Sequence, residues 1–367
     1  MEKAETPTNM LIPVFGTPSA LTAWAVHFAN VTVDVLAGEH EYIAAVALSD
    51  LRRSWSNRDS RAVVFHSDVP ENLISRLFLE SRIPLLIAHE DPLETIVYSM
   101  AARDIEWRQA VRFVSQSYST MAELFCAPNS TVVGPDHLQL PLSAFATVFL
   151  DAFGIDATEL EKRTIIGRML GNMGWELEET VRQNIGRHIP HASPLPILNK
   201  GWSDDERALA AEVIYQYSVV STGEQIRTLN WPPRILPDWD CLSEGLNGFK
   251  DLVGSGRIIT AGHALHLPRG KWRVSVQITV QGNYSGNHIE CDILLGDVSL
   301  GGMFARLPMD GTYGYEIDFE ISDAFPPTQF RMVLLEGAIE GQLRIDSVLF
   351  ESREHIQLHR AKKIRNR

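Results

Sequence analysis

The chain has little cysteine, little positive charge and no long apolar run, and each shortage excludes a class of protein. Its three cysteines, Cys126, Cys241 and Cys291, form no CxxC pair, which argues against a disulfide framework and a zinc–cysteine site. There are 33 Lys and Arg against 46 Asp and Glu, a formal charge of −13, so the chain lacks the cations that broad nucleic-acid binding requires. No uncharged stretch reaches the roughly 18 apolar residues of a membrane helix. The N-terminus also lacks signal-peptide form, so we expect a cytoplasmic protein without a transmembrane segment.

The composition and the length indicate a packed protein of two domains. Hydrophobic residues make up 45% and charged residues 22% of the 367 positions, which is typical of globular chains. At roughly 100 to 200 residues per domain, this length fits two. We expect an α/β domain over residues 1–225, a linker rich in Pro and Trp over 226–240, a β-sandwich over 241–352 and a basic tail over 353–367.

The first part of the chain alternates short apolar strands with helical stretches. The strand candidates are LIPVFG (11–16), RAVVFH (61–66) and RIPLLIAHE (82–90). Each is rich in branched apolar residues and is followed by turn or cap residues. Strand–helix–strand alternation predicts a three-layer α/β fold, in which a parallel sheet has helices on both faces.

Beyond residue 256 the hydrophobic period changes to two. In KWRVSVQITVQ (271–281), Trp272 and the branched apolar residues share one face, and polar residues share the other. YGYEIDFEI (313–321) repeats the pattern, with Tyr313 on the inward side. Several such strands, separated by Gly, Asn, Asp and Pro turns, predict an antiparallel β-sandwich of jelly-roll type.

The turn after the first strand is a candidate anion site. The segment FGTPSALTAW (15–24) leads from a strand into a helix, where backbone N–H groups and the helix dipole favour a phosphate. It contains no Lys or Arg and no GKS or GKT, so an ordinary capped turn is the alternative.

This segment resembles the donor loop of the sulfotransferase family, Gly-Thr-Pro-Arg-Ser-Gly-Ser-Thr-Leu-Leu, if one position is dropped. Four further segments follow in the family's order: HSDVP (66–70), HEDPLETIVYS (89–99), residues 130–156 and GWSDDERALAAEVIYQY (201–217). The resemblance implies a sulfotransferase-like fold and 3′-phosphoadenosine 5′-phosphosulfate, or its product, as the bound nucleotide. It also implies donor-binding and catalytic residues: Gly16, Thr17, Pro18, Ser19, Thr22 and Ser99 for the donor, and His66 and Asp68 for the transfer.

Departures from the family pattern weaken this donor site. The loop Arg is absent, and Glu90 stands where an Arg meets the 3′-phosphate. Ser99 also lies one residue further along than usual. Repulsion between two like charges about 4 Å apart costs roughly 1 to 4 kcal/mol. Arginines on the expected helices are possible replacements for the missing charge or ordinary surface residues: Arg103, Arg108, Arg112, Arg163 and Arg168.

His66 and Asp68 also admit a purely structural interpretation. A carboxylate can accept a proton from a sugar hydroxyl, and a histidine can stabilise departing charge. Alternatively, the two side chains cap the helix that follows, PENLISRLFLES (70–81). His188 and His191 have a spacing compatible with a metal, but no Cys or carboxylate pattern accompanies them. We therefore expect an ordinary loop there and no metal site.

The sandwich resembles the carbohydrate-binding modules attached to glycan-processing enzymes. Sugars bind such domains by stacking on exposed aromatic rings. Trp239, Tyr284 and Tyr313 lie in or near expected loops and are the candidate carbohydrate-binding residues, whereas Trp272 belongs to the core. A structural appendage or an oligomer interface is the alternative for this domain.

Three functional hypotheses follow. The first is a sulfotransferase-like enzyme of glycan modification, which transfers a group from a phosphorylated donor to a carbohydrate hydroxyl. The second is a catalytically inactive protein that keeps the sulfotransferase fold and serves in glycan binding or assembly. The third is a transferase that uses another phosphorylated donor, such as a nucleotide sugar. A cationic side chain facing residues 16–22 would favour the first hypothesis over the second.

Overall fold

The computed structural model describes residues 10–171, 179–192, 202–262 and 265–353. Their contacts divide the chain into two compact units. The first unit runs to Ser203 and also includes Val220–Glu224, and the second consists of Asp204–Val219 and the residues from Gln225 onward. The last crossing lies between Glu224 and Gln225, and the helix that begins at Asp204 groups with the second unit.

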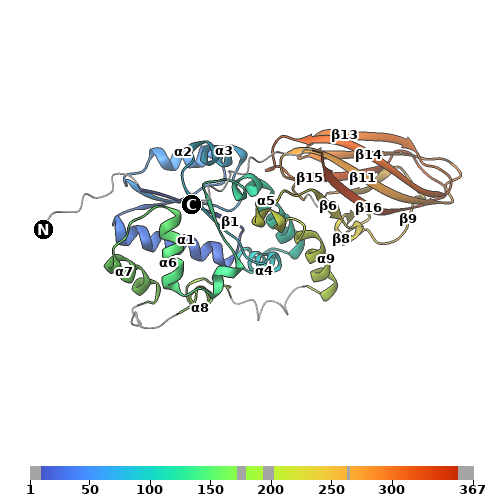
Figure 1. Cartoon of the computed structure of the whole chain (residues 1–367). Coiled ribbons are helices and arrows are strands. Elements are labelled where there is room, and N and C mark those ends of the chain that lie inside the picture. Colours follow the sequence, from blue (N-terminus) through green and yellow to red (C-terminus); the bar gives the residue numbers. More distant parts are fainter. Residues whose placement is uncertain (1–9, 172–178, 193–201, 263–264, 354–367) are drawn as a thin grey trace, which may run out of the picture. The chain divides into compact units, whose positions relative to one another are not determined.

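The first unit is built around a parallel sheet (Figure 1). Its strands are β1 (Met10–Gly16), β2 (Glu41–Ala44), β3 (Ala62–Ser67), β4 (Leu85–Ala88) and β5 (Ser130–Val133). Its helices are α1 (Ala20–Leu36), α2 (Leu48–Ser56), α3 (Asn72–Ser81), α4 (Pro92–Arg103), α5 (Trp107–Phe125), the 3-10 helix η1 (Pro135–Gln139), α6 (Leu142–Ala152), α7 (Glu159–Met169) and α8 (Val181–His188). Among the described residues the strand order is β2-β3-β1-β4-β5, and every pairing is parallel. The first strand of the sequence therefore lies at the centre of the sheet.

Helices cover both faces of this sheet, as the alternation of strands and helices predicts. On one face, α1, α6, α7 and α8 enclose an apolar core that includes Val14, Val64 and Trp24. The Trp24 indole donates a hydrogen bond to the side chain of Asn184 on α8 at 2.8 Å, so the one polar atom of that ring is satisfied inside the core.

The opposite face of the sheet carries α2 and α3 (Figure 1). Here Phe15 of β1 and Phe65 of β3 contact Phe78 of α3, with ring centroids 5.1 and 5.0 Å from that ring. Because β1 and β3 are buried on both faces, their sequences are continuous apolar runs rather than alternating patterns. The predicted three-layer α/β architecture is confirmed.

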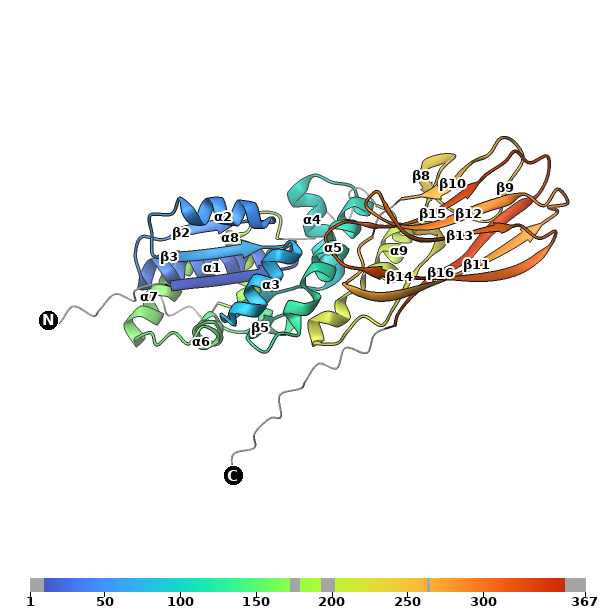
Figure 2. The same cartoon turned by 90° about the horizontal axis from the view of Figure 1, so that it is seen from above.

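The second unit is an antiparallel β-sandwich, as the period of two predicts. Its elements are α9 (Asp204–Ile214), η2 (Ser218–Thr222, which crosses between the units), β6 (Thr228–Trp231), η3 (Pro233–Ile235), β7 (Pro237–Asp238), β8 (Cys241–Gly245), β9 (Lys250–Asp251), β10 (Arg257–Ala261), β11 (Gly270–Gln281), β12 (His288–Leu295), β13 (Val298–Arg306), β14 (Gly311–Ile321), β15 (Thr328–Leu334) and β16 (Gln342–Ser352). One sheet has the order β10-β15-β12-β13, and the other has the order β14-β11-β16-β6, with β9 beside β16. The long strands of both sheets are seen in Figure 2.

Side chains alternate along β11 as the sequence pattern predicts, whereas Tyr313 on β14, expected on the inward side, is 40% exposed. On β11, Trp272, Val274 and Val276 are buried, while the residues between them are more exposed. The Trp272 indole donates to the carbonyl oxygen of Pro268 at 2.9 Å, which satisfies its polar atom at the edge of the core.

The Pro- and Trp-rich segment 226–240 contributes a strand to the sandwich. Its β6 pairs with β16, where Trp231 lies opposite Val348, and the Trp231 side chain is 1% exposed. These residues therefore form part of the core of the second unit. No helix in the described residues is long and apolar enough to span a bilayer.

Candidate functional site

The turn between β1 and α1 lies where the central strand meets the first helix. Gly16 ends β1, and Ser19 caps α1 by accepting a hydrogen bond from the Thr22 amide at 3.2 Å. A Cβ atom at Gly16 would overlap the carbonyl oxygen of Ala88 and the side chain of Thr22, which explains the glycine. The turn brings the predicted residues 16–22 together at the carboxyl edge of the sheet, which is the geometry of an anion site.

Several polar groups of this turn are bonded to the protein itself, while the buried Thr17 hydroxyl has no hydrogen-bond partner in the described residues. The Thr22 hydroxyl donates to the carbonyl oxygen of Ala88 at 3.1 Å, and the Thr17 amide donates to the same oxygen at 2.9 Å. Ser99 on α4, which the resemblance assigns to a phosphate, donates to the carbonyl oxygen of Pro18 at 3.1 Å and is buried. In this structure Ser99 therefore joins α4 to the turn.

Glu90 brings a carboxylate to the positive end of α1. It follows β4, is 6% exposed, and accepts a hydrogen bond from the Leu21 amide at 3.1 Å, with the Ala20 amide as a second partner. Burial raises the pKa of Glu90, and the hydrogen bond from Leu21 opposes this shift. The carboxylate lies where the dipole and the free amides of α1 would stabilise a bound phosphate.

Two arginines of this part of the unit pair with carboxylates, and the charge of one of them, Arg182, also acts to lower the pKa of Glu90. Arg182 of α8 lies 3.5 Å from Glu94 of α4, and Arg103 lies 2.7 Å from Asp68. In the described part of the chain, no hydrogen bond or ion pair connects a Lys or Arg side chain to residues 16–22. The turn thus has an acidic neighbour where the family pattern has basic ones.

His66 lies at the end of β3, beside the central strand. Its Nδ1 is 3.0 Å from the carbonyl oxygen of Val14, so we assign the proton to Nδ1 and leave Nε2 as the ring atom that can accept one. Burial lowers the pKa of His66, and the nearby Asp68 carboxylate opposes the shift. A neutral imidazole of this tautomer suits proton acceptance at Nε2.

Asp68 is held by a helix far along the chain rather than by the helix that follows it. Its Oδ2 is 2.7 Å from Arg103 of α4, with side chains 17% and 45% exposed respectively. The interpretation that Asp68 caps α3 is wrong, because the N-terminal cap of α3 is Glu71 and no side chain caps that helix. The Glu71 carboxylate instead accepts from the Leu48 amide of α2 at 2.9 Å.

The predicted catalytic pair lines a polar pocket at the carboxyl ends of β2 and β3. The pocket has a volume of about 350 Å³, within the range of small-molecule sites. Its walls are Ala44, Ala45, Val46, Asp50, Arg53, Ser54, His66, Ser67 and Asp68. The Ser67 hydroxyl is buried there without a hydrogen-bond partner in the described residues. The pocket therefore combines a neutral imidazole, two carboxylates, a guanidinium and an unpaired hydroxyl.

His188 is part of α8 rather than of a loop, contrary to the sequence-based expectation. Its Nε2 lies 2.6 Å from the carbonyl oxygen of Met169, and its ring centroid is 5.0 Å from that of His27. His191 follows with a positive φ of 62°. Within the described ranges, no group of three or more His, Cys, Asp or Glu side chains is arranged to hold a metal ion.

The structure groups two of the three predicted carbohydrate-binding residues at one end of the sandwich. Tyr284, 67% exposed, lies in the loop between β11 and β12, and Tyr313, 40% exposed, lies near the start of β14. Asp310 joins the two loops, since its carbonyl accepts from Tyr313 at 2.6 Å and its carboxylate accepts from the Gly282 amide at 2.7 Å. Trp239 lies on the turn between β7 and β8 and bonds to β10, the edge strand opposite β13.

An aromatic pair on β12 and β13 was not predicted. Phe304 is 66% exposed, and its ring stacks on His288 with centroids 5.1 Å apart and an angle of 17°. His288 Nδ1 is 2.7 Å from the Glu336 carboxylate, and this hydrogen bond lowers the pKa of Glu336. The stacking orients the Phe304 ring and leaves most of it exposed, which is the form of a sugar-stacking surface.

Sequence reasoning missed Phe304 because its direction depends on strand register. Glu290 on β12 lies opposite Phe304, and both point away from the core that buries Ile289 and Cys291. The available signal was an aromatic residue at an outward position of VSLGGMFAR (298–306). Phe304 can be recognised as facing outward only once the pairing of β13 with β12 is known.

Comparisons with known proteins find similarity of structure only. The chain matches no model of a known protein family and no curated protein sequence. A mouse sulfotransferase (SULT7A1), solved with PAP, is 8% identical, and the match covers 59% of this chain and 87% of that one with a TM-score of 0.39. The C-terminal CBM6 of LamC, a marine laminarinase from Zobellia galactanivorans, is 15% identical over 28% of this chain and 76% of that one, with a TM-score of 0.20. TmCBM61, solved with β-1,4-galactotriose, is 14% identical over 34% and 87%, with a TM-score of 0.23.

A sulfotransferase and several carbohydrate-binding modules are thus among the solved structures that resemble this chain, as its motifs predict. Because these TM-scores lie below 0.5, the function of the chain has to follow from its own contacts.

Proposed function

We propose that the chain is a glycan-binding protein with a sulfotransferase-like α/β domain whose donor site is closed by its own Glu90. The observation that carries the proposal is the hydrogen bond from the Leu21 amide to the Glu90 carboxylate at 3.1 Å. A donor phosphate would have to displace this carboxylate or bind beside it. Repulsion between like charges about 4 Å apart costs roughly 1 to 4 kcal/mol, and no cation of the turn offsets it.

The glycan-binding part of the proposal rests on the sandwich. A sugar ring can stack on the exposed face of Phe304, while the Glu290 carboxylate opposite it accepts hydrogen bonds from hydroxyls. Tyr284 provides a second exposed ring in the loop that leads into β12. Phe304 and Tyr284 are therefore the two rings that we expect to contact a glycan.

A glycan array tests this part with a matched pair of variants. Phe304→Ala removes the stacking ring, and Val298→Ala truncates a side chain of similar exposure, 64% against 66%, on the same strand. We expect the unmodified chain and Val298→Ala to retain the same glycans and Phe304→Ala to lose them. Equal binding by all three proteins would contradict the assignment of Phe304.

A second candidate function is transfer to a carbohydrate hydroxyl, with His66 and Asp68 assisting. The polar pocket of about 350 Å³ that they line favours it. In this reading His66 Nε2 accepts the proton of the hydroxyl, since Nδ1 is engaged by Val14. Arg103 and the Asp68 carboxylate position the neighbouring wall.

Nucleotide binding separates the two candidates. In a thermal-shift titration with 3′,5′-adenosine bisphosphate, a closed donor site predicts no shift for the unmodified chain. A saturable shift that Thr22→Ala abolishes would support the transferase instead and overturn the closed site. Glycan binding that survives His66→Ala and Asp68→Asn would keep the glycan-binding function separate from the polar pocket.

A further inference from the structure

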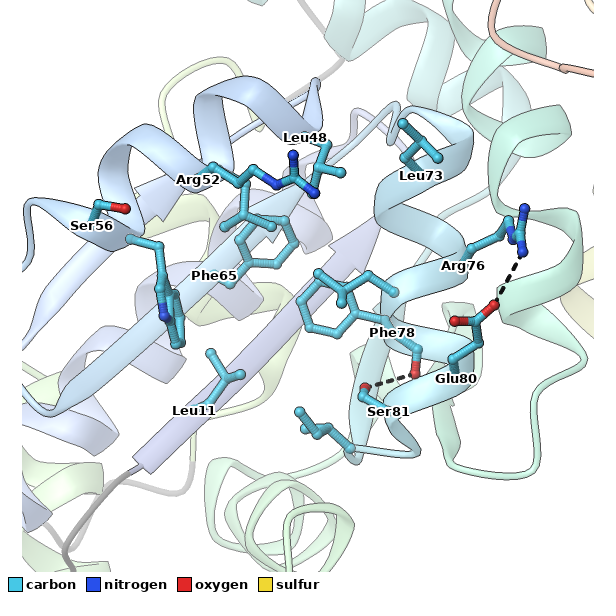
Figure 3. Close-up of a pocket in the computed structure, with 14 residues that line it drawn as sticks. Leu11, Leu48, Arg52, Ser56, Phe65, Leu73, Arg76, Phe78, Glu80 and Ser81 are labelled. Carbon is cyan, nitrogen blue, oxygen red and sulfur yellow. Dashed lines mark hydrogen bonds and ion pairs between the residues drawn. The ribbon is translucent and has the colours of Figure 1, made fainter.

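An apolar groove lies between α2 and α3 on the face of the sheet opposite α1 (Figure 3). It encloses about 580 Å³, within the range of small-molecule sites. Its lining consists of Leu11, Leu48, Leu51, Arg52, Trp55, Ser56, Phe65, Leu73, Arg76, Leu77, Phe78, Glu80, Ser81 and Ile83. The groove is separate from the β1–α1 turn and from the polar pocket at His66, and neither function proposed above uses it.

The groove is apolar because α2 and α3 carry apolar residues beyond those that pack against the sheet. On α3, Ile74 and Phe78 face the sheet and are buried, while Leu73 and Leu77, one turn apart, are 49% and 45% exposed. Trp55 on α2 is 37% exposed and lines the groove from the other side. A solvent-facing flank of a helix normally carries polar residues, so these side chains form an exposed apolar surface that the core does not account for.

The floor of the groove is buried, and its rim carries Arg52, a cation without a partner in the described residues. Phe65 is fully buried, and Phe78 is 4% exposed. Arg52 extends from α2 toward Leu48, across the opening above Phe65 (Figure 3). Arg52 has no hydrogen-bond or ion-pair partner in the described residues, whereas Arg76 on the far side of α3 pairs with Glu80 at 3.3 Å.

We infer that the groove binds a single long-chain carboxylate, such as a free fatty acid. The acyl chain would lie along the apolar floor between α2 and α3, and the carboxylate would pair with the Arg52 guanidinium at the rim. A partner protein fits less well, since α2 has nine residues, about 13 Å of helix, and a stable protein interface needs roughly 1,000 Å² or more.

Isothermal titration of the full chain with sodium dodecanoate below its micelle concentration tests the inference. We expect saturable binding with one ligand per chain. Arg52→Gln should weaken it about tenfold, and dodecanol should bind the unmodified chain about as weakly as dodecanoate binds Arg52→Gln. Leu77→Gln should weaken binding by tenfold or more, through loss of buried apolar area. Because both positions are exposed, these variants should keep their melting temperatures.

Matched controls decide between this site and nonspecific adsorption. Arg168→Gln removes a guanidinium that pairs with Asp34 and does not line the groove, and Leu160→Gln removes a leucine that is 76% exposed on α7. Both controls should bind dodecanoate as the unmodified chain does. Unsaturable uptake, or equal loss in the control and groove variants, would overturn the inference. Self-association that Leu77→Gln abolishes, without ligand binding, would assign the groove to a second copy of the chain and also overturn it.

Discussion

Replacing Glu90 by alanine should turn a closed anion site into an open one. In the folded chain the Glu90 carboxylate accepts from the Leu21 amide at 3.1 Å, at a position that is 6% exposed. Truncation leaves this buried N–H without an acceptor, which costs about 1 to 3 kcal/mol. For a unit of 150 to 250 residues, each kcal/mol corresponds to roughly 2 to 4 °C in melting temperature. We therefore expect the first unit of Glu90→Ala to melt about 2 to 12 °C lower than that of Glu90→Gln, which keeps a neutral acceptor at this position.

A bound anion should then accept the hydrogen bond from the Leu21 amide that the Glu90 carboxylate accepts in the unmodified chain. If sulfate binds the opened site with a Kd near 1 mM, 100 mM sulfate stabilises the variant by about 2.7 kcal/mol, and chloride at equal ionic strength does not. The assay is differential scanning fluorimetry of three proteins: the unmodified chain, Glu90→Ala and Glu94→Ala. Glu94 is the matched control because it lies on α4, 39% exposed and 3.5 Å from Arg182. An equal sulfate response in all three would refute the idea that Glu90 occupies an anion site.

The raised pKa of Glu90 predicts that the effect of replacing this residue on stability depends on pH. Burial raises the pKa of Glu90, so the folded chain binds this proton more tightly than the unfolded chain does. Ionisation of Glu90 therefore destabilises the folded chain. This destabilisation grows as the pH rises from the usual pKa of 4.5 toward the raised pKa. Glu90→Gln should gain stability relative to the unmodified chain at neutral pH, and the gain should vanish below pH 4.5. A loss of stability at neutral pH that disappears toward acid pH would mean that the Leu21 hydrogen bond, and not burial, dominates.

Three further predictions concern other parts of the chain. Asn184→Leu should lower the free energy of unfolding by about 2 to 4 kcal/mol in denaturant, since it leaves the buried Trp24 indole without its acceptor at 2.8 Å; a loss below about 0.5 kcal/mol would contradict that hydrogen bond. Phe304→Ala should change stability by less than about 0.5 kcal/mol because the ring is 66% exposed, yet weaken glycan affinity about tenfold in titration calorimetry. A double-mutant cycle of Asp68→Asn and Arg103→Gln should give a coupling of about 0.5 to 1 kcal/mol for this partly exposed pair, and a coupling of zero would remove its structural role.

Local sequence patterns were sufficient to predict the architecture of both units. The continuous apolar runs that became β1 and β3 can only be buried on both faces, so they specify a parallel sheet between helices. The alternation around Trp272 specifies a half-buried strand for the same reason of geometry. The strand within segment 226–240 was not predicted. Closely spaced Pro and Trp residues indicate an extended chain but do not show whether that chain pairs with a sheet.

Some contacts of the candidate site follow from local sequence and others do not. The sequence located residues 16–22 at a strand–helix turn and recognised that Glu90 is acidic where a cation was expected. It did not show that Glu90 bonds to Leu21 at the start of α1, 69 residues earlier in the chain. It also did not show that Asp68 pairs with Arg103, 35 residues later. Such contacts depend on the order of strands in the sheet, which no local periodicity contains.

By itself the sequence determined the fold class, the position of the strand–helix turn at residues 16–22 and the absence of Lys and Arg within it. These follow from periodicity and residue type, which act over a few neighbouring residues. Only the tertiary structure decided that the Glu90 carboxylate bonds to the start of α1, that Phe304 faces outward on His288, and that α2 and α3 leave an apolar groove between them. Each of these depends on which distant segments pack together and in what register, and packing is a property of the whole folded unit.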